Sequence, residues 1–137
     1  MIVVPNVGLL RLLNAMLGLY SPGALQVALF VGNYTPTHAD TEATYTAMEA
    51  TFAGYSRYTP SPWAAAYMVF NQATAYAAPR TWTVTASGGT DIVYGYFVLD
   101  AAGGLLWVSL EAQGPLPMRN AGDSYTCTPG LAYASQN

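Results

Sequence analysis

A chain of 137 residues fits a single domain and is long enough to bury a hydrophobic core without disulfide support. Charged residues make up only 8% of it, and lysine is absent. The four arginines are scattered singly, which argues against a nucleic-acid partner. Monomer surfaces usually carry about 25–35% charged residues, so this composition favours a chain that packs into an assembly.

The first 22 residues are expected to form an extended arm followed by an apolar helix. Pro5 disfavours helix in the residue before it, and Asn6 is a candidate N-cap. Within residues 7–20, large apolar side chains recur at the spacing of one helix face. A bilayer span needs roughly 20 apolar residues, whereas this run is shorter and is interrupted by Arg11 and Asn14, so no membrane partner is expected.

Such an apolar helix must be covered by the rest of the chain, by a second copy or by another protein. Burying six of its side chains is worth roughly 1.5–3 kcal/mol each. That sum is comparable to the whole stability of a small domain, about 5–15 kcal/mol. We therefore expect the arm and the helix to contact other subunits. The candidate contact residues are Ile2, Val3, Val4, Leu9, Leu10, Leu12, Leu13, Met16 and Leu17.

From residue 23 to residue 137 the pattern changes to short strands separated by turns rich in Gly and Pro. The predicted strands are 25–31, 67–70, 80–86, 92–99, 105–111 and 123–133, the last broken at 129–130. Residues 71–76 either pair back on 67–70 or form an edge. Between the first two strands, residues 37–51 hold most of the acidic side chains in a loop with a helical turn near 41–49.

The clearest hairpin joins 92–99 to 105–111 through the loop 100–104. This loop is typical of a hairpin that ends with a glycine in the left-handed region. Gly95 indicates a bulge or a close backbone approach. Both strands are apolar on both faces, so the hairpin is expected to be central. The sequence predicts a mainly β fold, an antiparallel β-sandwich or jelly roll at 23–137, preceded by the arm and helix at 1–22.

No constellation of residues predicts catalysis, a cofactor or a metal ion. His38 is the only histidine, and Asp40 stands near it, but no nucleophile motif accompanies them. Asp40 and Glu42 hint weakly at calcium, and a solvated loop explains them better. Cys127 stands alone, so no disulfide within the chain is expected, and we interpret it as a small buried hydrophobe.

Aromatic residues are spread throughout the chain and allow a binding function. Trp82 and Trp107 lie in alternating strands and are expected in the core. Trp63 stands in a loop flanked by prolines, and Tyr34 follows a strand. Tyr34 and Trp63 are therefore the candidate ligand-facing aromatics, of the kind on which sugar rings stack.

Several segments taken in order resemble a family of small virion-associated proteins of tailed bacteriophages. They are residues 4–6 with the leucine-rich helix, 29–36, 50–55, 93–100, 104–107 and 122–125. In that family an N-terminal apolar helix precedes a β-sandwich. The resemblance implies a capsid decoration or cement protein with no catalytic motif, placed on the outer shell between major capsid subunits.

The resemblance also implies a homotrimer that joins the virion surface after assembly in the host cytoplasm. It leaves head and tail locations open. The alternative function, from a different class, is a carbohydrate- or receptor-binding module of a phage tail or fibre that uses Trp63 and the loop tyrosines.

Overall fold

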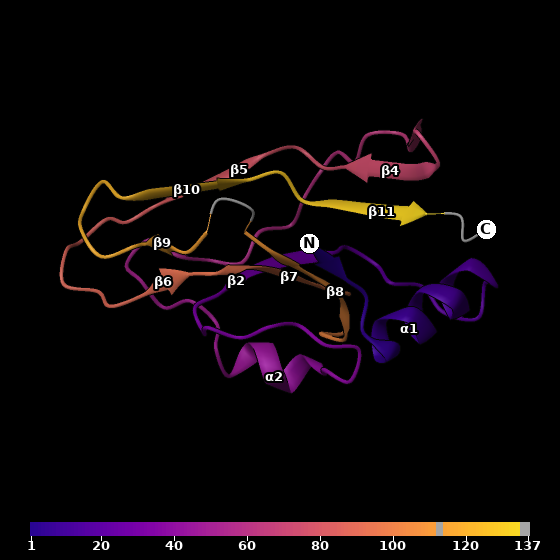
Figure 1. The fold of residues 1–137 in the computed structure, drawn as a ribbon, viewed down its shortest axis with the longest axis horizontal. Helices are drawn as coiled ribbons and strands as arrows, with labels where there is room; N and C mark the ends of the chain where they lie inside the picture. Colours follow the sequence, from indigo (N-terminus) through magenta and orange to yellow (C-terminus); the bar gives the residue numbers. More distant parts are fainter. Residues whose placement is uncertain (112–113, 135–137) are drawn as a thin grey trace.

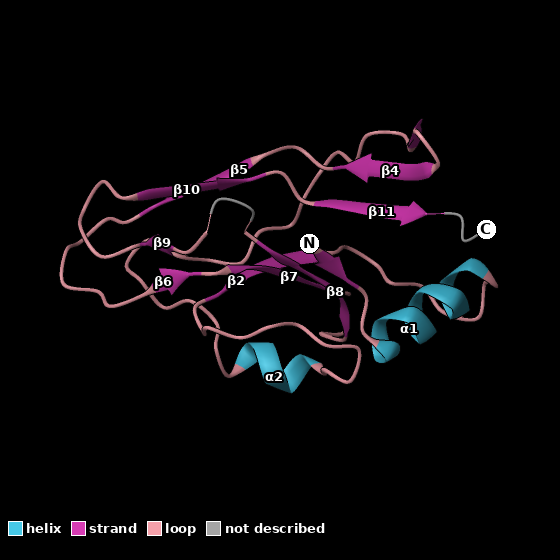
Figure 2. Ribbon diagram, in the orientation of Figure 1, coloured by secondary structure: helices cyan, strands magenta, loops and turns pink. Residues whose placement is uncertain are grey.

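The computed structural model describes residues 1–111 and 114–134 and shows antiparallel strands in two sandwich-like layers (Figure 1). The mainly β, antiparallel fold predicted from the sequence is confirmed. Residues 112–113 and 135–137 of the expected domain lie outside the described residues. One helix stands at the end of the layers and a shorter one lies under the first layer (Figure 2).

The first layer is a four-stranded sheet of order β1-β8-β7-β2. Its strands are β1 (Ile2–Val3), β2 (Gln26–Phe30), β7 (Gly95–Leu99) and β8 (Leu105–Leu110). The β7–β8 hairpin is central, as the apolar pattern predicts. A two-stranded ladder of β6 (Ile92–Val93) and β9 (Leu116–Pro117) lies beside it (Figure 1).

The second layer consists of two smaller antiparallel sheets. One pairs β5 (Arg80–Thr83) with β10 (Ser124–Cys127). The other has the order β11-β4-β3, from β3 (Tyr67–Val69), β4 (Gln72–Tyr76) and β11 (Gly130–Ala134). Residues 71–76 thus pair back on the strand before them. The expected last strand at 123–133 is divided into β10 and β11 around Pro129.

Both faces of the first layer are buried, because the sequence of β7 and β8 is apolar on both faces. One core lies between the layers and includes Val98, Trp107 and, from the second layer, Trp82. The other core lies on the opposite face and packs Phe97 against Tyr45 of α2 (Glu42–Thr46). The core positions predicted for Trp82 and Trp107 are confirmed, since each is at most 2% exposed.

The two glycines for which the sequence predicts a special backbone role, one in the loop 100–104 and Gly95, have that role. Gly103 has φ +87° in the turn after β7, the left-handed conformation that glycine adopts without steric cost. At Gly95 a Cβ atom would stand 2.1 Å from the carbonyl oxygen of Ser109. The close approach of β7 and β8 at this point therefore requires glycine.

The N-terminal segment is part of the fold rather than a free arm. Ile2 and Val3 pair with Ser109 and Val108 as β1, the edge strand of the first layer. The helix that follows, α1 (Asn6–Met16), begins one residue earlier than expected. Asn6 lies within it and makes no N-cap, because Pro5 occupies the N-cap position, and no side chain caps the helix there. The backbone of Ile2 and Val3 is therefore held by this chain's own sheet, and the expected contact of their side chains with neighbouring subunits stays a prediction.

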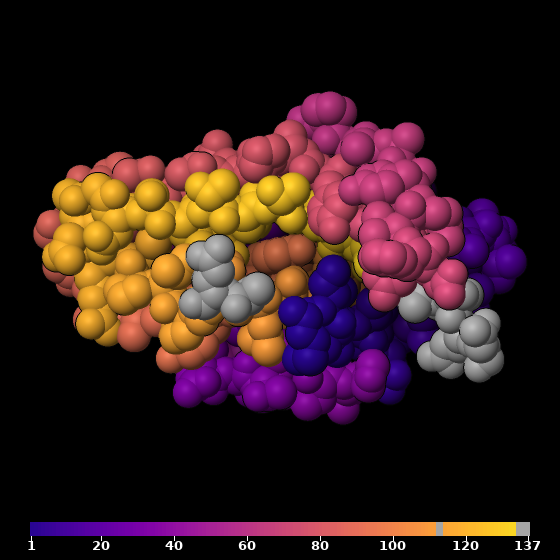
Figure 3. All heavy atoms as spheres, turned by 45° about the horizontal axis from the view of Figure 1, so that its top comes forward, coloured from indigo at the N-terminus to yellow at the C-terminus, as the bar shows by residue number. Residues whose placement is uncertain are grey.

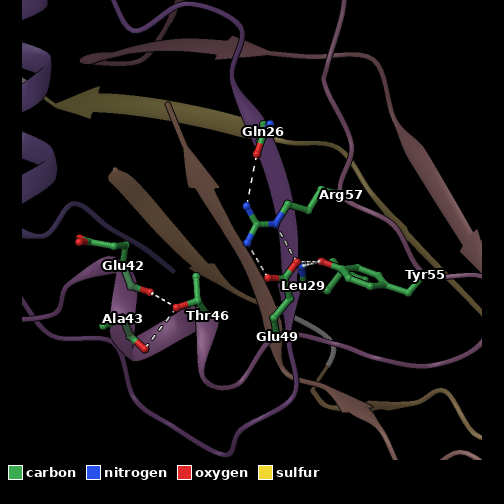
Figure 4. Close-up of polar contacts among 8 residues, drawn as sticks. All are labelled: Gln26, Leu29, Glu42, Ala43, Thr46, Glu49, Tyr55 and Arg57. Carbon is green, nitrogen blue, oxygen red and sulfur yellow. Dashed lines mark hydrogen bonds and ion pairs between the residues drawn. The ribbon is translucent and has the colours of Figure 1, made fainter. Parts of the chain in front are cut away.

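A partly buried ion pair holds the loop after α2 against β2 (Figure 4). Arg57 donates two hydrogen bonds to the carboxylate of Glu49, from Nη2 at 2.7 Å and from Nε at 2.9 Å. Its Nη1 atom donates a third bond to the side-chain oxygen of Gln26 at 3.3 Å. The hydroxyl of Tyr55 donates to the same carboxylate at 2.7 Å. Burial alone would raise the pKa of Glu49, but the bonds from Arg57 and Tyr55 lower it below its usual value.

Candidate functional site

Helix α1 turns its leucine-rich face outward. Leu9 and Leu13 are 47% and 50% exposed, and Met16 is 83% exposed. Leu10 of the helix, and Leu17 and Leu19 just beyond its end, are more than half exposed as well. The opposite side, with Gly8 and Leu12, faces the body of the protein. The helix is therefore inverted relative to an ordinary surface helix, whose apolar stripe faces the core.

Two contacts hold α1 in this orientation. Gly8 lies directly against β8, where an added Cβ atom would stand 1.9 Å from the carbonyl oxygen of Leu106. Arg11 turns inward and forms an ion pair with Asp100, with 2.5 Å between Nη1 and Oδ2. Tyr20 donates a hydrogen bond to the same carboxylate oxygen. The charged side chain of the helix, Arg11, is thus paired with a buried carboxylate, while most of its large apolar side chains face outward.

Asp100 is fully buried and fully hydrogen-bonded. Its Oδ1 atom accepts bonds from the backbone N–H groups of Ala102 and Gly104, each at 2.9 Å. Burial alone would raise the pKa of Asp100, but the bonds from Tyr20 and Gly104 and the charge of Arg11 lower it. The carboxylate therefore stays ionised and fastens both α1 and the segment after it to the β7–β8 turn.

The outer face of α1 continues into an apolar groove. This groove of about 510 Å³ is lined by the N-terminal strand, by Leu9 and His38, and by Ala132 and Tyr133 of β11. A second groove of about 300 Å³, lined almost wholly by apolar atoms, lies on the inner side of α1. Its lining residues are Leu12, Leu25, Trp63, Ala75, Trp107 and Leu131. Exposed apolar surface thus surrounds this end of the molecule.

The expected contact residues are divided by the structure into two groups. The exposed group comprises Ile2, Leu9, Leu10, Leu13, Met16 and Leu17. The half-buried group comprises Val3, Val4 and Leu12. Of these, Val4 and Leu12 pack against the core between the layers. Leu12 shares the spacing of one helix face with Leu9 and Leu13, yet it points inward, because Gly8 allows that side of the helix to approach β8.

A second exposed apolar surface lies on the β3–β4 hairpin, which periodicity predicted only as two strands. Tyr67, Met68 and Val69 of β3 are all exposed, and Phe70 in the turn is 97% exposed. The ring of Tyr67 contacts that of Tyr76 with 6.4 Å between centroids. The sequence signal for this surface is a long stretch without charge, residues 58–79.

The acidic loop is solvated at Glu42, as the sequence predicted, but not at Asp40. Asp40 is 5% exposed and accepts bonds from the hydroxyls of Tyr34 and Tyr45, both at 2.6 Å. Thr37 donates to it through its backbone N–H at 2.9 Å and its hydroxyl at 2.7 Å. His38 beside it is exposed, and its Nδ1 atom lies 3.1 Å from the carbonyl oxygen of Val4. These partners account for the carboxylate as a structural group.

A hollow of about 340 Å³ opens between the N-terminal strand and strands β10 and β11 (Figure 3). Tyr96 and Cys127 are among its lining residues, and the Tyr96 hydroxyl accepts a bond from the backbone N–H of Gly130 at 3.1 Å. Burial, with the charge of Glu111, raises the pKa of the Cys127 thiol to about 12. A thiol with that pKa is a poor nucleophile at neutral pH, so the buried-hydrophobe interpretation holds.

The two candidate ligand-facing aromatics are both half-buried. Trp63 packs edge-on against Trp107, with 6.1 Å between ring centroids, and Tyr34 donates to Asp40. Neither ring stands alone on the surface as a stacking platform. Within the described residues, no three His, Cys, Asp or Glu side chains are placed to hold a metal ion together. In the same part of the chain, no helix is long and apolar enough to cross a membrane.

Comparison of the chain with protein-family profiles, with curated proteins and with solved structures finds no match. The inverted helix and the apolar surface around it are therefore the features of the molecule that bear on its function.

Proposed function

We propose that this chain is a non-enzymatic structural protein of a tailed bacteriophage that decorates and stabilises the capsid. It docks on the major capsid protein through the outer face of α1 and acts as a symmetric oligomer on the shell surface. The virion setting comes from the sequence resemblance. The three copies that the resemblance also implies are not part of this proposal, because the strand pairing argued below joins two. The outward apolar face of α1 supports the choice of docking surface.

The observation that supports the docking role is the outward apolar face of α1. Monomeric proteins rarely expose contiguous apolar patches larger than a few hundred Å², and larger ones mark interaction sites. Here Leu9, Leu13 and Met16 lie in water while the charge of Arg11 is turned inward. A partner that covers this face would bury the apolar side chains that the fold of the single chain leaves exposed.

The low charge of the chain supports the same role. Buried interfaces are depleted of charged residues, because each buried charge needs a partner. Apolar burial contributes about 25 cal/mol per Å². Because many copies engage one shell, modest contacts of this kind add up to a stable coat.

The test replaces Leu9 and Leu13 by aspartate in one variant and measures co-sedimentation with empty capsids. Both side chains are about half exposed, so we expect the β layers to keep their far-UV strand signal. Two unpaired charges in a dry interface cost several kcal/mol, so capsid binding should fall by at least about a hundredfold.

The matched control places two aspartates at Thr83 of β5 and Thr90 shortly before β6, which are both exposed. Strands β5 and β6 lie away from α1, which stands at one end of the molecule (Figure 1). This variant carries the same added charge and should bind capsids as the wild-type protein does. If the Leu9→Asp, Leu13→Asp variant fails to fold, the helix belongs to the core of the chain and the docking role is wrong. Capsid binding equal to that of the control would contradict it as well.

The carbohydrate-binding alternative stays a prediction with its own measurement. Binding on a glycan array that is abolished by Trp63→Ala would favour a tail or fibre module over the capsid role.

A further inference from the structure

Strand β3 has the sequence of an internal strand but lies at the edge of its sheet. In the order β11-β4-β3 it has a partner on one side only. Tyr67 and Val69 lie on one face and Met68 on the other, and all three are exposed. Strands that are apolar on both faces are normally covered on both faces and paired on both edges.

Apart from its short length of three residues, the edge lacks the features that keep exposed strands from pairing. Proteins guard free edges with charged side chains, prolines, bulges or covering segments. Residues 58–79 contain no charged side chain, and residues 67–70 contain no proline. The strand is short, and its apolar side chains and unguarded edge remain open to another strand.

The hairpin turn determines which backbone groups face outward. Val69 pairs with Gln72 across the two-residue turn Phe70-Asn71, and Tyr67 pairs with Thr74. Pairs that exchange hydrogen bonds alternate along an antiparallel ladder, so the N–H and C=O of Met68 turn away from β4 towards the free edge. Phe70, the first turn residue, has φ +53° and carries its ring into solvent.

We propose that β3 pairs with β3 of a second copy of this chain, antiparallel, about a two-fold axis at Met68. The two β11-β4-β3 sheets then form one continuous sheet, and Tyr67, Val69 and Phe70 of each copy pack on the other hairpin. This contact goes beyond the proposed docking role, because it joins copies to each other and leaves the outer face of α1 to the capsid.

A second copy is the occupant that the strand itself specifies. Antiparallel pairing of identical strands about a two-fold axis always matches donors with acceptors, and here no like charges meet. Taking about 150–250 Å² for a whole aromatic side chain, the exposed hairpin side chains amount to roughly 500 Å² in each copy. Two copies together therefore offer at most about 1,000 Å² for burial, the lower limit of a specific interface.

The first measurement is the mass of the whole protein in solution by light scattering at micromolar concentration. We expect a dimer. Met68→Lys places two like charges opposite each other on the axis and should raise the dimer dissociation constant about tenfold or more. Thr83→Lys adds the same charge on an exposed strand position of β5 and should leave the dimer intact.

The second measurement tests the register by cross-linking. Met68→Cys places two thiols on the axis, within reach of a disulfide, so oxidation should give a covalent dimer. Phe70→Cys places them several residues apart in the paired strands and should give none, and Cys127 is buried. A monomer, a trimer or open-ended aggregates by light scattering, or equal cross-linking of both variants, would overturn the proposal. None of these outcomes bears on capsid binding by α1, which is measured separately.

Discussion

Asp40 shows at the scale of one residue how the fold uses its few charges. The carboxylate lies in a loop that looks solvated in the sequence, yet it is buried beneath two tyrosine hydroxyls. Tyr45 in turn packs its ring against Phe30 and Phe97, with centroids 5.3 and 5.6 Å away. Asp40 therefore anchors the loop and α2 to the second core.

Asp40→Asn should destabilise the protein. The amide keeps one acceptor oxygen but replaces the other by an NH₂ donor, which faces the donors of Tyr34, Tyr45 and Thr37. Leaving a buried donor without an acceptor costs about 1–3 kcal/mol. Urea unfolding at pH 7 should show a loss of that size in the free energy of unfolding.

His38→Ala is the control in the same loop. His38 is exposed, and substitutions at such positions usually change stability by less than about 0.5 kcal/mol. We expect this variant to keep its melting temperature and its capsid binding. Equal unfolding free energies for Asp40→Asn and wild type would show that the buried hydrogen bonds do not stabilise the fold. A hydrolytic turnover lost in His38→Ala would contradict the non-enzymatic role.

At the scale of an element, Gly8 determines how α1 lies on the sheet. Alanine is the better helix former, by about 1 kcal/mol, so propensity alone predicts that Gly8→Ala stabilises the helix. The structure predicts the opposite, because the new Cβ atom would meet the carbonyl oxygen of Leu106, which is backbone and cannot turn aside. We expect a loss of about 1–3 kcal/mol in the free energy of unfolding, as for other overpacked contacts.

Asn14→Ala provides the comparison, because it raises helix propensity at a half-buried position away from the Gly8 contact. It should leave stability unchanged or raise it by a few tenths of a kcal/mol. Urea unfolding followed by far-UV circular dichroism measures both variants. A gain in stability for Gly8→Ala would mean that α1 does not pack on β8 at this distance.

At the scale of the whole molecule, four carboxylates connect stability to pH. The pKa values of Asp40, Glu49, Asp100 and Asp123 all lie below their usual values in the folded state. The unfolded chain, with pKa values of about 3.9 for Asp and 4.3 for Glu, binds protons first as the pH falls. The stabilisation is therefore complete above about pH 5 and is lost as the pH falls through the folded-state values.

We expect the urea midpoint of the wild-type protein to stay constant between pH 7 and pH 5 and to fall steadily between about pH 4 and pH 2. Asp40→Asn should show a shallower fall, since one of the four groups no longer titrates. A midpoint that rises on acidification would contradict the hydrogen-bonded carboxylates of the structure.

Most strands and turns could be predicted from the sequence because their signals are local, but the two-residue strands β1 and β9 were not predicted. The alternation of apolar and polar residues identified β2 and β5. The runs of β7 and β8 that are apolar on both faces identified the central hairpin. Glycines identified the turn of this hairpin and the point where its two strands approach most closely. The candidate site was predicted only in part. Periodicity found the apolar residues of α1, but it did not find the exposed hairpin as a surface.

Only the tertiary structure decided which side of α1 faces water and which acids are buried. The helix is inverted because Gly8 fits against Leu106 and because Arg11 meets Asp100, which is far away in the chain. Asp40 is buried because the rings of Tyr34 and Tyr45 close over it. Composition and periodicity determined the strands and the presence of surplus apolar surface. Contacts between distant residues determined where that surface lies, because a close backbone approach and a buried ion pair leave no periodic signal in a sequence.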